Sequence, residues 1–183
     1  MSEEFEKILI YHCAPTIRGI KSANLINCSI KSIPSIMDDI KEVNSKGNKI
    51  HIRILKSEKD KLLILVYNLL ELSRILLNKD NQNYLCSFGY KYNNTTDIEY
   101  NLRLLSERIN SSTLFPNEIG VFLGYDLDDI KEFDKGNKNC LYVGYWKVYS
   151  NLKEKLRIFS SYNYCKKSLI KYVNEGNSIV SLV

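Results

Sequence analysis

The spacing of apolar residues along the first part of the chain predicts a helix followed by a strand. Apolar positions three and four apart predict an amphipathic helix over residues 3–14, with His12 on its apolar face. Pro15 disfavours helical geometry in the residue before it, so this helix is expected to end at Ala14. Residues 23–30 are then expected to form a short strand.

Two more strands and two more helices are expected before residue 79. A helical stripe over residues 33–43 predicts the second helix, and strict alternation over residues 50–54 predicts a half-buried strand. A polar turn at residues 57–60 leads into the continuous apolar run of residues 62–67, which is typical of a central strand. Leucines at helical spacing predict a helix over residues 69–78.

The pattern is less regular in the second half. Residues 79–95 are rich in Asn, Tyr and Ser and predict a loop, with a strand over residues 84–92 as the alternative. Thr96 and Glu99 form a capping box that opens a helix. The apolar residues 116–124 suit a helix or a buried strand, and we favour the helix. The other expected elements are a helix from its N-cap Asp126 to Gly136, a β-rich run at 140–149, a helix over 152–169 and a strand at 178–183.

This alternation of helices and strands predicts the fold class and the domain organisation. An α/β or α+β fold with a single mixed sheet covered by helices accommodates all of the elements. The chain of 183 residues has the length of one domain and contains no low-complexity stretch or linker. We therefore expect a single globular domain over residues 1–183.

Charge and cysteine content indicate the compartment more than the function. The net charge is +5, but Lys and Arg are spread along the chain and Lys greatly outnumbers Arg, which weakens the interpretation as a nucleic-acid-binding protein. The acidic N-terminus has no apolar segment of a signal peptide, and residues 62–77 are too charged to span a membrane. We therefore expect a cytoplasmic protein whose five cysteines are reduced.

Sequence motifs of common enzymes are absent. The chain has no Gly-x-Gly-x-x-Gly, Walker A, Cys-x-x-Cys, His-Glu-x-x-His or Gly-x-Ser-x-Gly pattern. The paired carboxylates Asp38/Asp39 and Asp128/Asp129 fall in helix turns, where Asp stabilises the positive end of a helix or is solvated. The sequence therefore assigns neither an enzyme class nor a cofactor.

The first candidate site is a thiol site around Tyr11-His-Cys-Ala-Pro-Thr16. His12 and Cys13, together with Cys140 and Cys165 on two other elements, would suit zinc, copper(I), an iron–sulfur cluster or a redox cofactor if these elements converge. The competing interpretation is a buried histidine beside a small structural cysteine, since buried free cysteines are usually structural.

The second candidate site is an aromatic pocket. In this hypothesis Glu118 acts as acid or base, and Lys147 binds an anion or a carbonyl group. The walls would come from Tyr125, Tyr145 and Trp146, the last of which is the only tryptophan. The competing interpretation is that residues 143–149 are an aromatic strand that fills the core.

Four motifs together resemble a known family. They are His12-Cys-Ala-Pro-Thr16, Phe115-Pro-x-Glu-Ile-Gly-x-Phe-Leu-Gly-Tyr125 with Asp129 four residues on, Gly144-Tyr-Trp-Lys-Val-Tyr149 and Phe159-x-x-Tyr-x-x-Cys165. This series resembles the uncharacterised domain of unknown function 3793 from anaerobic, low-GC bacteria, over nearly the whole chain. Asp126 departs from the family, which usually has Pro there. The resemblance implies one intact cytoplasmic domain, and it places His12, Cys13, Glu118, Tyr125, Trp146, Lys147 and Cys165 in the family pattern.

Two functions of different classes follow from these observations. The first is a cytoplasmic protein that binds a small ligand, a metal or a redox cofactor through the thiol or aromatic site. The second is a non-catalytic interaction module, in which a basic C-terminal helix binds an acidic protein or nucleic acid. That helix would present Lys153, Lys155, Arg157, Lys166, Lys167 and Lys171.

Overall fold

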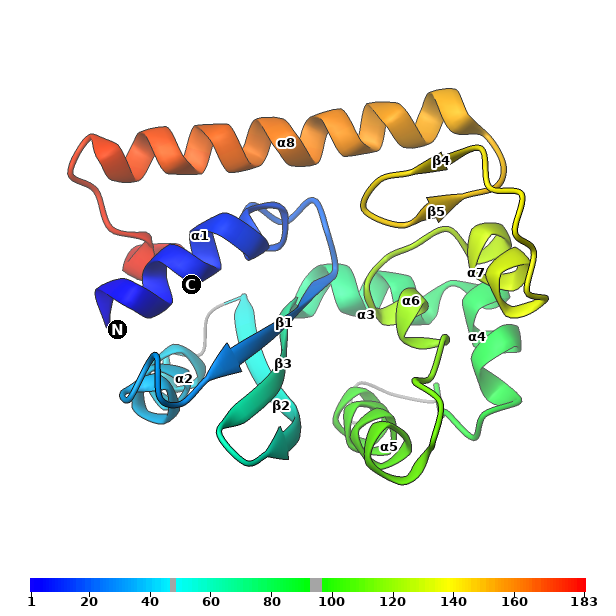
Figure 1. Ribbon diagram of the computed structural model, residues 1–183, viewed down its shortest axis with the longest axis horizontal. Helices are drawn as coiled ribbons and strands as arrows, with labels where there is room; N and C mark the ends of the chain where they lie inside the picture. The colour runs from blue at the N-terminus through cyan, green and yellow to red at the C-terminus, as the bar shows by residue number, and fades with distance from the viewer. Residues whose placement is uncertain (47–48, 93–96) are drawn as a thin grey trace.

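The computed structural model describes residues 1–46, 49–92 and 97–183, and a three-stranded antiparallel sheet lies at its centre (Figure 1). The strand order is β1–β3–β2, so the apolar run predicted as a central strand does lie between the other two. The side chains of β3 are buried on both faces of the sheet, as is expected for a strand in its centre. The strands are β1 (Ala23–Ser29), β2 (Ile50–Glu58) and β3 (Lys61–Asn68).

Helices cover both faces of the sheet, which gives three layers (Figure 1). Ile26, Ile64 and Val66 belong to a core with α1, α2 and the end of α8. Leu65 and Tyr67, which alternate with them, belong to a second core with α3, α5 and α6. The predicted α/β or α+β class, with helices around a sheet, is thus confirmed, although the central sheet is antiparallel and not mixed. The helices named here are α1 (Glu3–Ile17), α2 (Ile36–Ser45), α3 (Leu69–Leu77), α5 (Asp97–Ser111), α6 (Ile119–Phe122) and α8 (Leu152–Asn174).

The expected end of the first helix at Ala14 is wrong, because α1 continues through Pro15 to Ile17. The stop signal is Gly19, which has a φ of +71°. Its N–H donates to the Thr16 carbonyl, and the N–H of the next residue donates to the Pro15 carbonyl, as in a Schellman motif. A proline that is buried in the core therefore stays inside the last turn of this helix.

Residues 79–95 are not simply a loop, because α4 (Lys79–Cys86) forms there. The side chain of Asn78 accepts hydrogen bonds from the N–H groups of Asp80 and Asn81, which caps the helix. Leu85 then fixes the helix against the second core. No strand forms over residues 84–92, and Thr96 of the expected capping box lies outside the described residues.

The helix favoured for residues 116–124 is confirmed, but only as the short α6. The β-rich run at 140–149 is not one strand. It folds back as a small antiparallel hairpin of β4 (Tyr142–Val143) and β5 (Lys147–Val148). A side chain at Gly144 would overlap the Phe159 ring, so the turn of the hairpin packs directly on α8. The strand expected at residues 178–183 is instead the short helix η1 (Ile179–Ser181).

The long helix α8 connects the two ends of the molecule (Figure 1). Its second half packs against α1, and its first half covers the hairpin. Phe159 and Tyr162 of α8 form a third small core with Trp146 and Val148 of the hairpin. Within the parts of the chain that the structure describes, no helix combines the length and apolar character needed to cross a membrane.

Candidate functional site

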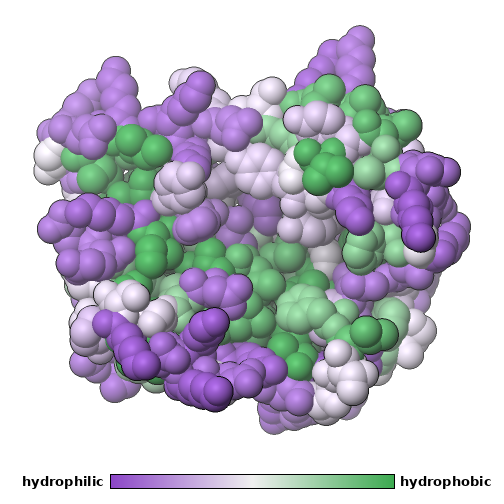
Figure 2. All heavy atoms as spheres, in the orientation of Figure 1, coloured by the Kyte–Doolittle hydropathy of each residue, from purple (hydrophilic) through white to green (hydrophobic). Residues whose placement is uncertain are grey.

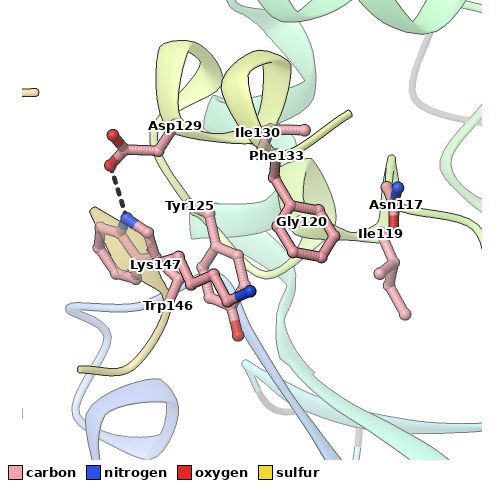
Figure 3. Close-up of a pocket in the computed structure, with 9 residues that line it drawn as sticks. All are labelled: Asn117, Ile119, Gly120, Tyr125, Asp129, Ile130, Phe133, Trp146 and Lys147. Carbon is pink, nitrogen blue, oxygen red and sulfur yellow. Dashed lines mark hydrogen bonds between the residues drawn. The ribbon is translucent and has the colours of Figure 1, made fainter. Parts of the chain in front are cut away.

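A pocket of about 240 Å³ opens between α6, α7 (Leu127–Asp134) and β5 (Figure 3). Its walls are mainly apolar and aromatic, and three polar side chains lie among them. Concave apolar sites with a few polar groups are the usual form of small-molecule sites. The lining residues are Asn117, Ile119, Gly120, Tyr125, Asp129, Ile130, Phe133, Trp146 and Lys147.

Helix α7 is held at its N-terminus by Asp126, as the sequence predicts. One carboxylate oxygen of Asp126 accepts from the N–H groups of Asp128 and Asp129, at 3.0 and 3.3 Å. The other oxygen lies 2.5 Å from the ammonium group of Lys155, a buried lysine on α8. Asp126 therefore both starts α7 and ties it to α8.

The buried carboxylate of Asp129 connects α7 to the hairpin. Its Oδ2 accepts from the indole N–H of Trp146 at 2.8 Å, the bond that is dashed in Figure 3. Its Oδ1 accepts from the backbone N–H groups of Tyr149 and Ser150 at 2.7 and 3.2 Å. Bonds to a charged acceptor are the stronger class of hydrogen bond, so Asp129 fixes the position of the hairpin relative to the pocket.

Trp146 is packed between two other rings. Tyr125 stacks on it at a centroid distance of 4.9 Å, and Phe159 contacts it edge to face at 4.6 Å. Such arrangements contribute stability beyond the area they bury. The tryptophan is therefore a fixed wall of the pocket, and its indole reports on the state of this region.

A buried lysine lies behind Tyr125. The ammonium group of Lys21 donates to the backbone carbonyls of Ala23 and Leu123, and it lies 5.4 Å from the centre of the Tyr125 ring. Burial lowers its pKa to about 7. Within the described residues no carboxylate lies at ion-pair distance from Lys21. The sequence does not reveal the burial of this group, which is one of twenty lysines.

The structure brings three of the five predicted pocket residues together, namely Tyr125, Trp146 and Lys147. The other two lie elsewhere. Glu118 is buried and accepts from the Arg108 guanidinium and, at 3.3 Å, from the Tyr90 hydroxyl. Tyr145 packs against α8, where its hydroxyl donates to Asn163 at 3.0 Å. The lining residues that sequence reasoning did not propose are Asn117, Ile119, Gly120, Asp129, Ile130 and Phe133.

The residues of the predicted thiol site lie in unlike surroundings. His12 is exposed on α1, which corrects its expected place on the apolar face, whereas Cys13 beside it is fully buried. Burial raises the pKa of the Cys13 thiol, which makes it a poor nucleophile. Cys140 and Cys165 are half-buried. Among the residues that the structure describes, no three His, Cys, Asp or Glu side chains are grouped to hold a metal ion, so the predicted metal site gains no support.

Comparison with known proteins gives one informative result. No curated protein matches the chain, and no solved structure matches it. A family model described as "Protein of unknown function (DUF3793)" matches residues 9–183, which include all of the pocket and the hairpin. The chain therefore belongs to the DUF3793 family, as its four motifs indicate.

Proposed function

We propose that this protein binds a small organic molecule in the pocket between α6, α7 and β5. The observation that carries the proposal is the anchoring of the hairpin by Asp129, which keeps Trp146 and Lys147 at the pocket. A pocket whose walls are already held in place costs a ligand little ordering free energy on binding.

The size of the pocket limits the ligand. Its volume of about 240 Å³ is below the roughly 300–1,000 Å³ of sites for drug-sized molecules. The walls include side chains of isoleucine, phenylalanine, tyrosine and tryptophan, which favour an apolar body. We therefore propose a ligand with one or two rings.

Binding without catalysis is the simpler role for this pocket. An acid or base needs a side chain that can reach the substrate and exchange a proton with it. Asp129 is the carboxylate among the lining residues, and both of its oxygens already accept N–H groups of the hairpin. Glu118, which we proposed as acid or base, is paired with Arg108 away from the pocket.

Replacement of Phe133 with alanine is expected to weaken binding about fivefold, which corresponds to about 1 kcal/mol of lost apolar contact. Phe133 lines the pocket but is 42% exposed, so the fold should tolerate its loss. The probe is naphthalenemethanol, a neutral two-ring alcohol, and its binding is followed by NMR through the single indole N–H signal of Trp146.

The matched control is Phe115→Ala, which removes a phenylalanine of similar exposure, 49%, that does not line the pocket. This variant should bind the probe as tightly as the unmodified protein does. The proposal is wrong if the folded protein shows no saturable shift of the indole signal, or if the two variants weaken binding to the same extent.

We also propose that the protein works in the cytoplasm. All five of its cysteines are free thiols, and two of them are buried in the first core. Free thiols are usual in the reducing environment of the cytoplasm.

A second candidate function is supported by one face of α8. Lys153, Arg157, Lys167 and Lys171 follow each other along an exposed stripe, with Ser160 and the exposed Tyr164 between them. The six positions are three or four residues apart, so they share one side of the helix. Such a stripe favours binding of a polyanionic partner, an acidic protein or a nucleic acid. Lys155 is not part of it, because it is buried against Asp126.

Binding through this stripe predicts retention on immobilised heparin that decreases steeply with salt. Simultaneous replacement of Lys153, Arg157 and Lys167 with glutamine should lower the eluting salt concentration. The control replaces Lys49, Lys61 and Lys138, which are exposed elsewhere, and gives the same net charge. Equal elution of the two triple variants would show that retention depends only on net charge.

A further inference from the structure

The polar groups at the pocket indicate which charge a ligand carries. Three lining side chains are polar, namely Asn117, Asp129 and Lys147. The carboxylate of Asp129 is 2% exposed and accepts three N–H groups of the hairpin, at 2.7, 2.8 and 3.2 Å. Its charge is therefore balanced by donors of the protein itself, and its oxygens are directed to the hairpin rather than to the pocket (Figure 3).

Lys147 is a cation without a carboxylate partner in the described part of the chain. It is the first residue of β5, directly after Trp146. Its ammonium group lies 5.0 Å from the centre of the Phe133 ring, which forms the opposite wall of the pocket. In Figure 3 its side chain crosses the pocket between Trp146 and Phe133. An ammonium group over an exposed ring is stabilised only weakly, so it remains available to an anion.

Neighbouring acids do not cancel this charge at the pocket. Helix α7 is acidic, but its carboxylates are engaged elsewhere or face another side; Asp134, for example, accepts from the Tyr84 hydroxyl. Asp126 is paired with Lys155, and Glu132 lies 2.6 Å from the ammonium group of Lys135. Asp128 lines a separate polar hollow on the α4 side of α7, together with Asp80. Lys147 is thus the charged group that a ligand in this pocket can pair with.

We infer that the ligand is a small organic acid, with an apolar body of one or two rings and an anionic group that pairs with Lys147. This inference rests on the proposed function and makes Lys147 the residue that determines specificity for charge. The apolar body contacts Ile119, Ile130 and Phe133, and the anion stays near the solvent, where burying it costs little.

Three probes of one shape test the inference, namely naphthoate, naphthalenemethanol and naphthylmethylammonium. We expect the acid to bind about fivefold more tightly than the alcohol, as one partly exposed ion pair allows, and the amine to bind most weakly. Lys147→Met keeps the unbranched apolar stem and removes the charge. It should abolish the advantage of the acid, so that the acid and the alcohol bind this variant equally tightly.

Lys138→Met is the matched control, because it removes an exposed lysine that does not line the pocket. It should preserve the advantage of the acid. Equal binding of acid and alcohol to the unmodified protein, or an equal loss for both in Lys147→Met, would overturn the inference and leave the proposed function intact. Failure of all three probes to shift the Trp146 signal of the folded protein would overturn both.

Discussion

Replacing Asp129 with alanine is expected to lower the free energy of unfolding by about 3 kcal/mol. Three N–H groups lose their acceptor, and each unsatisfied buried donor costs roughly 1–3 kcal/mol, although water reaches part of this region after the change. The hairpin should also loosen, so that Trp146, which is 8% exposed, becomes more accessible. Denaturant unfolding measures the first effect, and a red shift of tryptophan emission before unfolding measures the second.

Asp128→Ala is the matched control, because it removes a neighbouring carboxylate from the same helix turn. Asp128 is exposed and should contribute only its favourable charge at the helix N-terminus, about 0.3–1 kcal/mol. A loss in Asp129→Ala no larger than in this control would show that the carboxylate does not hold the hairpin.

The stability of the protein is expected to rise with pH between about pH 7 and 8.5, because of Lys21. In the unfolded chain this lysine keeps its proton up to a pKa of about 10.4. In the folded chain burial lowers its pKa to about 7, and a neutral amine still supplies the N–H donors for the carbonyls of Ala23 and Leu123. The unfolded state therefore binds more protons in this range, so stability increases by up to about 1.4 kcal/mol per pH unit.

The penalty for burying the Lys21 charge is present in full below the folded pKa of about 7. Above about pH 8.5 the buried thiol of Cys13 has the opposite effect, because burial raises its pKa and the unfolded thiol loses its proton first. Denaturant unfolding at several pH values measures the slope. Lys21→Met should remove it, and the exposed Lys153→Met should not. If the slope persists in Lys21→Met, other titratable groups cause it.

Signals that act within a few residues were sufficient to predict much of this fold. The apolar run of β3 and the capping side chain of Asp126 depend on neighbours in the sequence, and both predictions are confirmed. The predicted end of α1 was wrong because Pro15 was taken as the residue that stops the helix, whereas the stop is at Gly19. The hairpin after Cys140 was missed because its turn depends on Phe159, which lies on another element.

The candidate site was predictable only where its residues are aromatic side chains or, as with Lys147, the direct neighbour of one. Tyr125 and Trp146 were proposed as walls and do line the pocket. Glu118 was proposed with them, but its side chain turns to Arg108, while its neighbours Asn117 and Ile119 reach the pocket. A sequence does not give the direction in which side chains point at the start of a short helix such as α6, where Glu118 is the N-cap residue. The role of Asp129 also depends on a partner seventeen residues away.

The most direct test of the central claim is the position of a bound probe in solution. Nuclear Overhauser contacts between naphthoate and the protein report which protons lie close together. We expect contacts from the probe rings to the rings of Phe133 and Trp146, which face the pocket from opposite walls. Hydrophobic side chains also gather at the surface over β4 and the start of α8, where Leu141, Val143 and Leu156 are exposed (Figure 2). Contacts confined to those residues, with none to Phe133 or Trp146, would contradict the claim.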